Sequence, residues 1–340
     1  MPYFANRRCA TDRLPPRPRV ATLRILERRR APRDCRPMQK VTVRVPASTS
    51  NLGPGFDCLG VALRIHNDVT VTRGAKSRLQ AIVGEAADLF FHQTHRAPFS
   101  FFASITGNVP CARGLGSSVT LRLGVLRALN ALIGNPLDRL SIFQLCARLE
   151  GHPDNAAPAV FGGFTVVQAG VRPIIQRFDV SALLSFVLLI PDVELKTSAA
   201  RRILPSRITH AAAVENCANA CAITAAIASG NYRNLRGAFV DHLHQPYRKR
   251  LIPFLPHAIA AAEKAGALGA FLSGSGSTIC AITLHSPKKI AAAMLRAAGS
   301  TSAHTLITRA DNQGARILPL RTPQSATRNP QLRWAAGLKI

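Results

Sequence analysis

The sequence predicts an α+β protein with two lobes that share one site, and three observations support this fold class. The chain has 340 residues, and at ~150 residues per domain this length suggests about two domains. Strand-like and helix-like segments are intermingled along the chain, without an internal repeat. Hydrophobic residues make up 47% of the sequence and aromatic residues only 6%, so we expect a sizeable core built from Ala, Leu, Ile and Val.

The spacing of apolar residues indicates where the individual elements lie. Strands are expected at 41–45, 67–73, 99–106, 186–190 and 279–283. Helices are expected at 119–133, 141–149, 198–204, 208–229 and 287–298. Ser141 is a candidate N-cap of its helix, and Gly230 is placed to end the helix that precedes it.

The two ends of the chain differ from its centre in composition. Residues 1–37 contain eleven Arg and no Lys against three acids, with many prolines and little periodicity, so a disordered leader is expected there. A targeting peptide is the functional alternative, and Met38 could be the natural start. The lobes are then expected at 38–165 and 166–320, followed by a loose tail at 321–340.

The formal net charge of +27 raises the hypothesis of a nucleic-acid partner or a membrane surface. The basic residues beyond the leader are scattered through segments that look folded, and few aromatic residues accompany them as a base-stacking surface requires. A generally basic surface that attracts an anionic small molecule explains the charge better. We therefore expect no specific nucleic-acid partner.

Cysteine usage and hydropathy exclude some other classes of protein. The eight cysteines include no CxxC pair, which argues against a zinc site and favours free buried thiols in a reducing cytoplasm. The most apolar stretch, 211–229, is interrupted by Glu215, Asn216 and Asn219, so no membrane span is expected.

The strongest single motif is Pro110-Cys-Ala-Arg-Gly-Leu-Gly-Ser-Ser118, between an expected strand and an expected helix. Glycines let a backbone approach a ligand closely, and the N–H groups at a helix start form a nest for phosphate oxygens. The loop lacks the Gly-Lys-Ser/Thr ending of a Walker A motif and is not a dinucleotide GxGxxG. Its candidate phosphate-binding residues are Pro110, Arg113, Gly114, Leu115, Gly116, Ser117 and Ser118.

Three further motifs concentrate glycine and polar residues. The first is Ser50-Asn-Leu-Gly-Pro-Gly-Phe-Asp57, which follows the first expected strand. The second is Glu150-Gly-His-Pro-Asp-Asn155, which packs two acids, an imidazole and an amide into six residues. The third is Leu272-Ser-Gly-Ser-Gly-Ser277, which links two expected strands. Each of them is weak evidence for a site when it is taken alone.

In their order along the chain, these four motifs resemble those of the GHMP kinase superfamily, and within it the homoserine kinase family. The resemblance runs from about Val41 to Leu320 and rests on PASTSNLGPGFDCLGVAL, ARGLGSS, EGHPDNAAPAVFGG and LSGSGS. LKTSAARRILP and HQPYRKRLIP are similar to family segments that contact the amino acid. The resemblance implies a two-lobe fold, with a left-handed βαβ unit in the nucleotide lobe and an α/β sandwich as the second lobe. It also implies phosphoryl transfer from Mg-ATP to L-homoserine for threonine biosynthesis, in the cytoplasm; a homodimer stays open.

The resemblance also suggests roles for individual residues. Ser118 and Glu150 are expected to hold Mg²⁺ as hard oxygen donors. Arg201 and Arg248 can clamp the carboxylate of a zwitterionic substrate. The remaining candidates for the substrate ammonium and hydroxyl are Asn51, Asp57, His152, Asp154 and Thr197.

The acceptor hydroxyl must also lose its proton. Asn155 stands where other members of the superfamily have an aspartate base, and an amide cannot accept a proton at neutral pH. Positioning and electrostatics are then expected to carry the rate, with ATP itself taking the proton. Glu150, Asn155 and Asp57 are thus the candidate catalytic residues.

The chain departs from the family pattern at three places. Val119-Thr120 follows Ser118 where small residues are usual, Cys111-Ala112 stands where a glycine is common, and Gln245 replaces an acid. A related kinase of mevalonate or a sugar is the nearest alternative, but those substrates lack the zwitterion that Asp57 and the two arginines suit. A basic nucleic-acid-binding protein is the alternative from another class.

Overall fold

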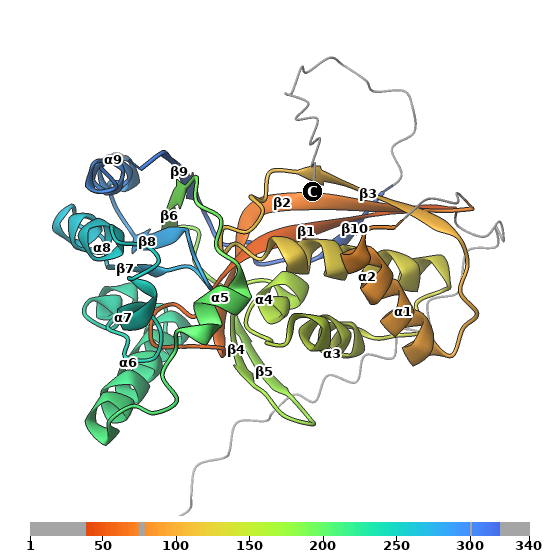
Figure 1. Ribbon diagram of the computed structural model, residues 1–340, viewed down its shortest axis with the longest axis horizontal. Helices are drawn as coiled ribbons and strands as arrows, with labels where there is room; N and C mark the ends of the chain where they lie inside the picture. Colours follow the sequence, from red (N-terminus) through yellow and green to blue (C-terminus); the bar gives the residue numbers. More distant parts are fainter. Residues whose placement is uncertain (1–38, 75–78, 300, 320–340) are drawn as a thin grey trace, which may run out of the picture. The chain divides into compact units, whose positions relative to one another are not determined.

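The computed structural model describes residues 39–74, 79–299 and 301–319 (Figure 1). The predicted leader at 1–37 and the predicted tail at 321–340 lie outside the described residues. Between them the chain forms two antiparallel sheets with helices packed against them, which confirms the α+β class.

The first sheet is built on a long hairpin of β1 (Lys40–Ser50) and β2 (Leu59–Arg73). The outer part of β2 pairs with β3 (Phe101–Gly107), and its inner part pairs with β4 (Phe164–Gln168), which in turn pairs with β5 (Ile174–Phe178). The short strand β10 (Arg316–Leu318) returns from the end of the chain to pair with β1. The predicted boundary between residues 165 and 166 falls inside β4. In addition, β5 and β10, which lie in the range expected for the second lobe, pair with the first sheet.

Helices cover one face of this sheet (Figure 1). They are α1 (Ala81–Thr94), α2 (Ser117–Leu132), α3 (Arg139–Glu150) and α4 (Ala156–Phe161). Because β3 and β4 both run antiparallel to β2, they are parallel to each other, and α2–α4 form the βαβ connection between them. The left-handedness of this connection stays a prediction. The core here is aliphatic apart from a few phenylalanines such as Phe90 and Phe143.

The second sheet has the order β7 (Gly269–Leu272), β8 (Ile279–Thr283), β6 (Ser185–Pro191) and β9 (Ala303–Thr308). Successive side chains of β6 alternate between two cores, as the period of a strand requires. Val187 and Leu189 pack toward α8 (Leu255–Lys264) and α9 (Pro287–Ala297). Phe186 and Leu188 pack in a core that also contains Leu59 of β2 and so joins the two sheets.

The remaining helices follow β6 in the chain. They are α5 (Thr197–Arg202), α6 (His210–Ala228), the 3₁₀ turn η1 (Tyr232–Leu235) and α7 (Gln245–Arg248). In the described part of the chain, α6 is the one helix whose length and hydropathy could cross a membrane, with 22% of its most apolar window buried. It is weak evidence for a span, because Ile223, Ala226 and Ile227 pack in the core that joins the sheets.

Two local predictions were wrong. The N-cap of α3 is Asp138, whose carboxylate accepts from the Ser141 N–H at 2.7 Å, and not Ser141. Asp138 stands three residues before that N–H, which is the reach that a capping carboxylate needs. Of the described cysteines, Cys111, Cys217 and Cys221 are exposed, so the thiols are free but not all are buried.

Candidate active site

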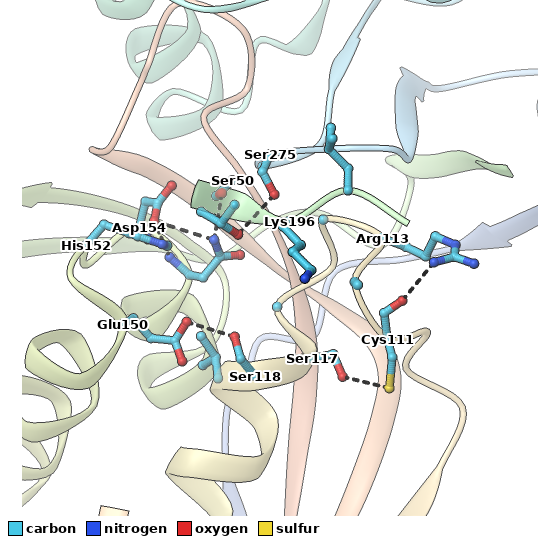
Figure 2. A pocket seen from close by; sticks show the side chains of 18 of the residues that line it. Ser50, Cys111, Arg113, Ser117, Ser118, Glu150, His152, Asp154, Lys196 and Ser275 are labelled. Atoms are coloured by element: carbon cyan, nitrogen blue, oxygen red, sulfur yellow. Dashed lines mark hydrogen bonds and ion pairs between the residues drawn. The ribbon is translucent and has the colours of Figure 1, made fainter. Parts of the chain in front are cut away.

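The four motifs meet at one cavity of about 680 Å³. Its walls come from the ends of elements in both lobes: the loop after β1, the start of α2, the end of α3, the start of α5 and the loop after β7. Figure 2 shows side chains from these segments around a common space. Residues far apart in the sequence therefore share a single site.

The glycine loop before α2 is fixed by both lobes. The carbonyl of Leu115 accepts from the Ser48 N–H at 3.2 Å, and Leu115 itself is fully buried in the core that joins the sheets. On the other side, the carbonyl of Gly114 accepts from the Ser273 hydroxyl at 2.7 Å. Leu115 thus anchors the loop and can reach a ligand only through its backbone.

Gly116 is the N-cap residue of α2, with φ +68°, and no side chain caps the helix. The first N–H groups of a helix lack partners within it, and the helix dipole adds positive potential there. The start of α2 is therefore suited to bind phosphate oxygens.

Ser118 and Glu150 face each other across the start of α2 and the end of α3 (Figure 2). The Ser118 hydroxyl donates to Glu150 Oε2 at 2.8 Å. The other oxygen, Oε1, accepts from Arg122 at 2.7 Å, and the Arg122 guanidinium also contacts Glu85 at 3.1 Å. Burial alone lowers the pKa of Arg122, but the two carboxylates outweigh it and raise that pKa. Two hard oxygens at the phosphate end of the cavity fit a magnesium ion bound together with a nucleotide.

Arg113 does not direct its charge toward the phosphate loop. Its guanidinium donates to the carbonyl of Pro191 at 2.9 Å and pairs with Asp192 at 2.8 Å and Glu194 at 3.4 Å. Figure 2 shows the side chain turned away from Ser118. The contacts make Arg113 a link between the loop and the end of β6. The expectation that its charge faces the phosphates does not agree with them.

Asp57 and Arg201 form the polar end of the cavity. Arg201 donates to both oxygens of Asp57, at 2.6 and 3.0 Å. The backbone of Asp57 has φ +59°, and its N–H donates to Asn51 Oδ1 at 3.0 Å, which holds the turn. The Asn51 amide in turn donates to the carbonyl of Gly274 at 3.0 Å, so both ends of this amide bind the protein.

Arg248 is the most deeply buried cation near the cavity, with 1% of its surface exposed. Its Nε donates to the carbonyl of Ala200 at 3.1 Å, and one terminal nitrogen donates to the carbonyl of Gly274 at 2.9 Å. The same nitrogen contacts His244 Nδ1 at 3.3 Å, while His244 Nε2 lies 2.9 Å from the carbonyl of Gly53. This pattern requires a neutral imidazole with its proton on Nε2, and burial lowers the pKa of His244 to about 4.

His152 and Asp154 form a close pair, with Nδ1 and Oδ1 separated by 2.6 Å. Burial alone lowers the pKa of His152, but the hydrogen bond and charge of Asp154 outweigh it and raise that pKa. Burial likewise opposes ionisation of Asp154, and the same partner holds its pKa below the usual value. Ligand atoms of Asp57, His152 and Asp154 all lie within 4.8 Å of one another, so two carboxylates lie close enough together to accept from one ammonium group.

Two more predicted residues lie at the cavity wall. Asn155 accepts from the Ser48 hydroxyl at 2.8 Å and donates to the Ser50 hydroxyl at 2.8 Å, which ties the third motif to β1. The Thr197 hydroxyl lies 3.3 Å from that of Ser275.

Comparisons with known proteins agree with this geometry. The family model described as the GHMP kinases N terminal domain matches residues 81–163, and the one described as GHMP kinases C terminal matches residues 223–301. A homoserine kinase of Microchaete diplosiphon is 37% identical over 303 residues, which cover 83% of this chain and 98% of that protein. One from Caldicellulosiruptor saccharolyticus is 36% identical and is covered over its whole length.

The chain belongs to the homoserine kinase family of GHMP kinases.

A solved structure of a homoserine kinase from Cytophaga hutchinsonii supports this assignment. Its TM-score is 0.76 at 26% sequence identity, and the match covers 83% of this chain and 98% of that one. A crystal structure of a mevalonate kinase has a TM-score of 0.59 at 14% identity, which shows the shared GHMP fold alone. The predicted fold and kinase class are therefore confirmed.

Most predicted site residues of this homoserine kinase family member line the cavity. Those that line it are Asn51, Asp57, Arg113, Gly114, Gly116, Ser117, Ser118, Glu150, His152, Asp154, Asn155, Thr197, Arg201 and Arg248. Pro110 instead lines a second cavity of about 410 Å³, which shares Cys111 and Arg113 with the first.

Three residues that contact the predicted site residues were not among those predicted from the sequence: Arg122, His244 and Phe56. The Phe56 ring lies 5.4 Å from the guanidinium carbons of both Arg201 and Arg248. A signal existed for the first two, because Arg122 is four residues after Ser118 and His244 is four residues before Arg248. Residues at this spacing lie on one face of a helix.

Proposed function

We propose that this protein transfers the γ-phosphoryl group of ATP to the side-chain hydroxyl of L-homoserine, giving O-phospho-L-homoserine and ADP. One observation carries the proposal: a single cavity connects a helix N-terminus suited to phosphates with a corner that suits a zwitterion. All four charged residues of that corner line the cavity, and we expect Asp57 and Asp154 to accept from the ammonium while Arg201 and Arg248 donate to the carboxylate. The relatives named above support homoserine as the acceptor.

Different residues of the chain have different roles in the phosphoryl transfer. The N–H groups at the start of α2 bind phosphate oxygens, and Ser118 and Glu150 would hold Mg²⁺, which neutralises phosphate charge when it is bound. The acceptor oxygen forms a bond to the γ-phosphorus, and the bond from that phosphorus to the bridging oxygen of ADP breaks. The hydroxyl proton passes to a γ-phosphate oxygen, because the amide of Asn155 cannot take it.

The protein's place in metabolism follows from the same proposal. A phosphomonoester of homoserine has a better leaving group than homoserine itself, as a later elimination or substitution requires. This agrees with a role in threonine biosynthesis, and we propose a cytoplasmic location, where the ATP pool is available.

The test compares acceptors that each lack one charge of homoserine. We expect 4-hydroxybutyrate, which lacks the ammonium, and 3-amino-1-propanol, which lacks the carboxylate, to lose on the order of 10²-fold or more in kcat/KM. With mevalonate, galactose or shikimate as the acceptor, the enzyme should release ADP no faster than it does when no acceptor is present. Comparable rates for homoserine and any of these compounds would disprove the assignment of the acceptor.

A further inference from the structure

The cations around the phosphate end of the cavity are mostly neutralised by protein groups. Arg113 pairs with Asp192 and Glu194, and Arg122 is held between Glu150 and Glu85. At the other end, Arg201 is paired with Asp57, and Arg248 donates to the carbonyls of Ala200 and Gly274 at the amino-acid end of the cavity. Beyond the proposed Mg²⁺, a mobile side-chain cation at this end could follow the γ-phosphoryl group during its transfer, and these engaged arginines do not provide one.

Lys196 meets the requirements for such a cation. It lines the cavity, it is exposed, and in the part of the chain that the structure describes its ammonium has no hydrogen-bond or ion-pair partner. Figure 2 shows its side chain extending into the space beside the glycine loop that leads to Ser117 and Ser118.

The backbone on both sides of Lys196 is fixed against the glycine loops. The preceding residue, Leu195, donates its N–H to the carbonyl of Ala112 in the phosphate loop at 3.3 Å. The following residue, Thr197, contacts Ser275 in the loop after β7 at 3.3 Å. Lys196 itself is the N-cap residue of α5 in an extended conformation, with φ −69° and ψ 130°. Its backbone is thus held in place while its flexible stem leaves the ammonium free to move.

We propose that Lys196 is a catalytic residue that contacts the γ-phosphoryl group during its transfer. Its ammonium keeps its proton throughout, while the bond from phosphorus to the bridging oxygen breaks and the bond to the acceptor oxygen forms. A compact charge on a flexible stem can follow the phosphoryl group from ATP toward the acceptor, which a buried guanidinium cannot do. The inference depends on ATP-dependent phosphoryl transfer, but it does not depend on homoserine as the acceptor.

The experiment replaces Lys196 with Met, which keeps the apolar stem and removes the charge, and with Arg, which keeps the charge. Lys288→Met is the matched control, because Lys288 is exposed on α9 and does not line the cavity. We expect Lys196→Met to lower kcat on the order of 10²–10³-fold with little change in the KM for homoserine, and Lys196→Arg to recover part of that loss. Lys288→Met should retain wild-type kinetics. Circular dichroism and Tm verify that each variant is folded.

Equilibrium binding separates this role from the identity of the acceptor. With Mg²⁺ and no acceptor present, Lys196→Met should weaken binding of a non-hydrolysable ATP analogue on the order of 10-fold and leave ADP binding unchanged, because only the analogue carries the γ-phosphate. If kcat stays at the wild-type value, or if the homoserine KM rises while kcat is kept, Lys196 does not act on the phosphoryl group. An equal loss of ADP and analogue binding would also overturn the inference. If homoserine is not the acceptor, the binding difference still tests Lys196.

Discussion

The side chain of Arg248 is buried and contacts two backbone carbonyls and the imidazole of His244. Its pKa is lowered to about 10, first by burial and then by the nearby charge of Arg201, so the side chain stays protonated at neutral pH. His244 supports it as a neutral acceptor, since its Nδ1 faces Arg248 and its Nε2 faces the carbonyl of Gly53. The guanidinium is thereby held in a fixed orientation at the cavity wall.

Arg248→Leu should therefore raise the KM for homoserine on the order of 30-fold or more and leave the KM for ATP nearly unchanged. The variant should also have a lower Tm, because the carbonyls of Ala200 and Gly274 lose their donor. Arg248→Lys should recover only part of the loss, since a point charge cannot reproduce the planar fork. Steady-state kinetics in both substrates check this. An equal rise of the ATP KM would show that Arg248 does not belong to the amino-acid end.

Glu150 and Glu85 both contact Arg122, but only Glu150 also contacts Ser118. Glu150→Gln should lower kcat on the order of 10²-fold and raise the Mg²⁺ concentration needed for half-maximal rate, because the charge proposed to hold the metal is removed. Glu85→Gln is the matched control and should stay close to wild type. A Mg²⁺ titration of the activity of both variants tests whether Glu150 binds the metal. If the two show the same Mg²⁺ dependence, Glu150 acts only through Arg122.

Some residues of the candidate site could be predicted from the sequence, and others could not. Ser118, Glu150 and Arg201 stand in motifs whose order along the chain predicts a shared site, and the structure places all three at one cavity. The contacts of Arg113 could not be foreseen, because its partners Asp192 and Glu194 are about eighty positions away and belong to no motif. Lys196 stands in LKTSAARRILP, whose resemblance points to the amino acid, so the sequence did not indicate that this exposed lysine lies beside the phosphate loop.

At the scale of elements, backbone hydrogen bonds join three loops from different parts of the chain. The loop before α2 lies against the loop after β7, where Thr278 N–H donates to the carbonyl of Arg113 at 3.1 Å. The loop after β1 contacts the same segment, since Gly274 N–H donates to the carbonyl of Ser50 at 3.2 Å. The conformation of the loop before α2 therefore depends on the close approach of its backbone to the backbone of the loop after β7.

Gly114→Ala tests this close approach. Gly114 has φ +73°, and a Cβ there would overlap the carbonyl oxygen of Ser273. Gly134 has φ +89° but nothing within 4 Å of a Cβ, so Gly134→Ala carries the backbone strain of about 1–2 kcal/mol without the overlap. We expect Gly114→Ala to lose most of its kcat and more stability than Gly134→Ala, which should keep its kcat. Similar kcat values for the two would show that the loop can shift freely.

Local periodicity predicted α2 and β6 to within about two residues at each end, but it gave no element for α1, α8 or β9. It predicted only the outer half of β2, at 67–73, whereas the strand begins at Leu59. The inner half reads Leu-Gly-Val-Ala-Leu, which lacks the polar alternation of a half-buried strand because it is buried on both faces.

At the scale of the whole molecule, the chain returns from the second sheet to the first through Asp311. Asp311 Oδ1 accepts from the N–H groups of Gln313 and Gly314, and Oδ2 contacts His66 of β2 at 2.7 Å and Arg316 of β10 at 3.3 Å. No local sequence pattern predicts that β10 pairs with β1, because this pairing joins residues that are more than 270 positions apart.

Asp311→Asn should therefore weaken the whole fold in a manner that depends on pH. Burial opposes ionisation of Asp311, but His66, the two backbone N–H groups and Arg316 outweigh it and lower its pKa to about 2. Because this pKa lies below the unfolded value of about 3.9, the carboxylate stabilises the folded state above pH ~4, and the contribution is lost as the pH falls toward 2.

Urea unfolding between pH 3 and pH 7 checks this dependence. We expect Asp311→Asn to lower the free energy of unfolding by about 1–3 kcal/mol at pH 7, with roughly half of that difference remaining at pH 3. Asp179→Asn removes an exposed carboxylate, which is paired with Arg177, and should change stability by less than about 0.5 kcal/mol. A difference for Asp311→Asn that stayed constant down to pH 3 would mean that its charge does not hold the returning chain and that shape and neutral hydrogen bonds do.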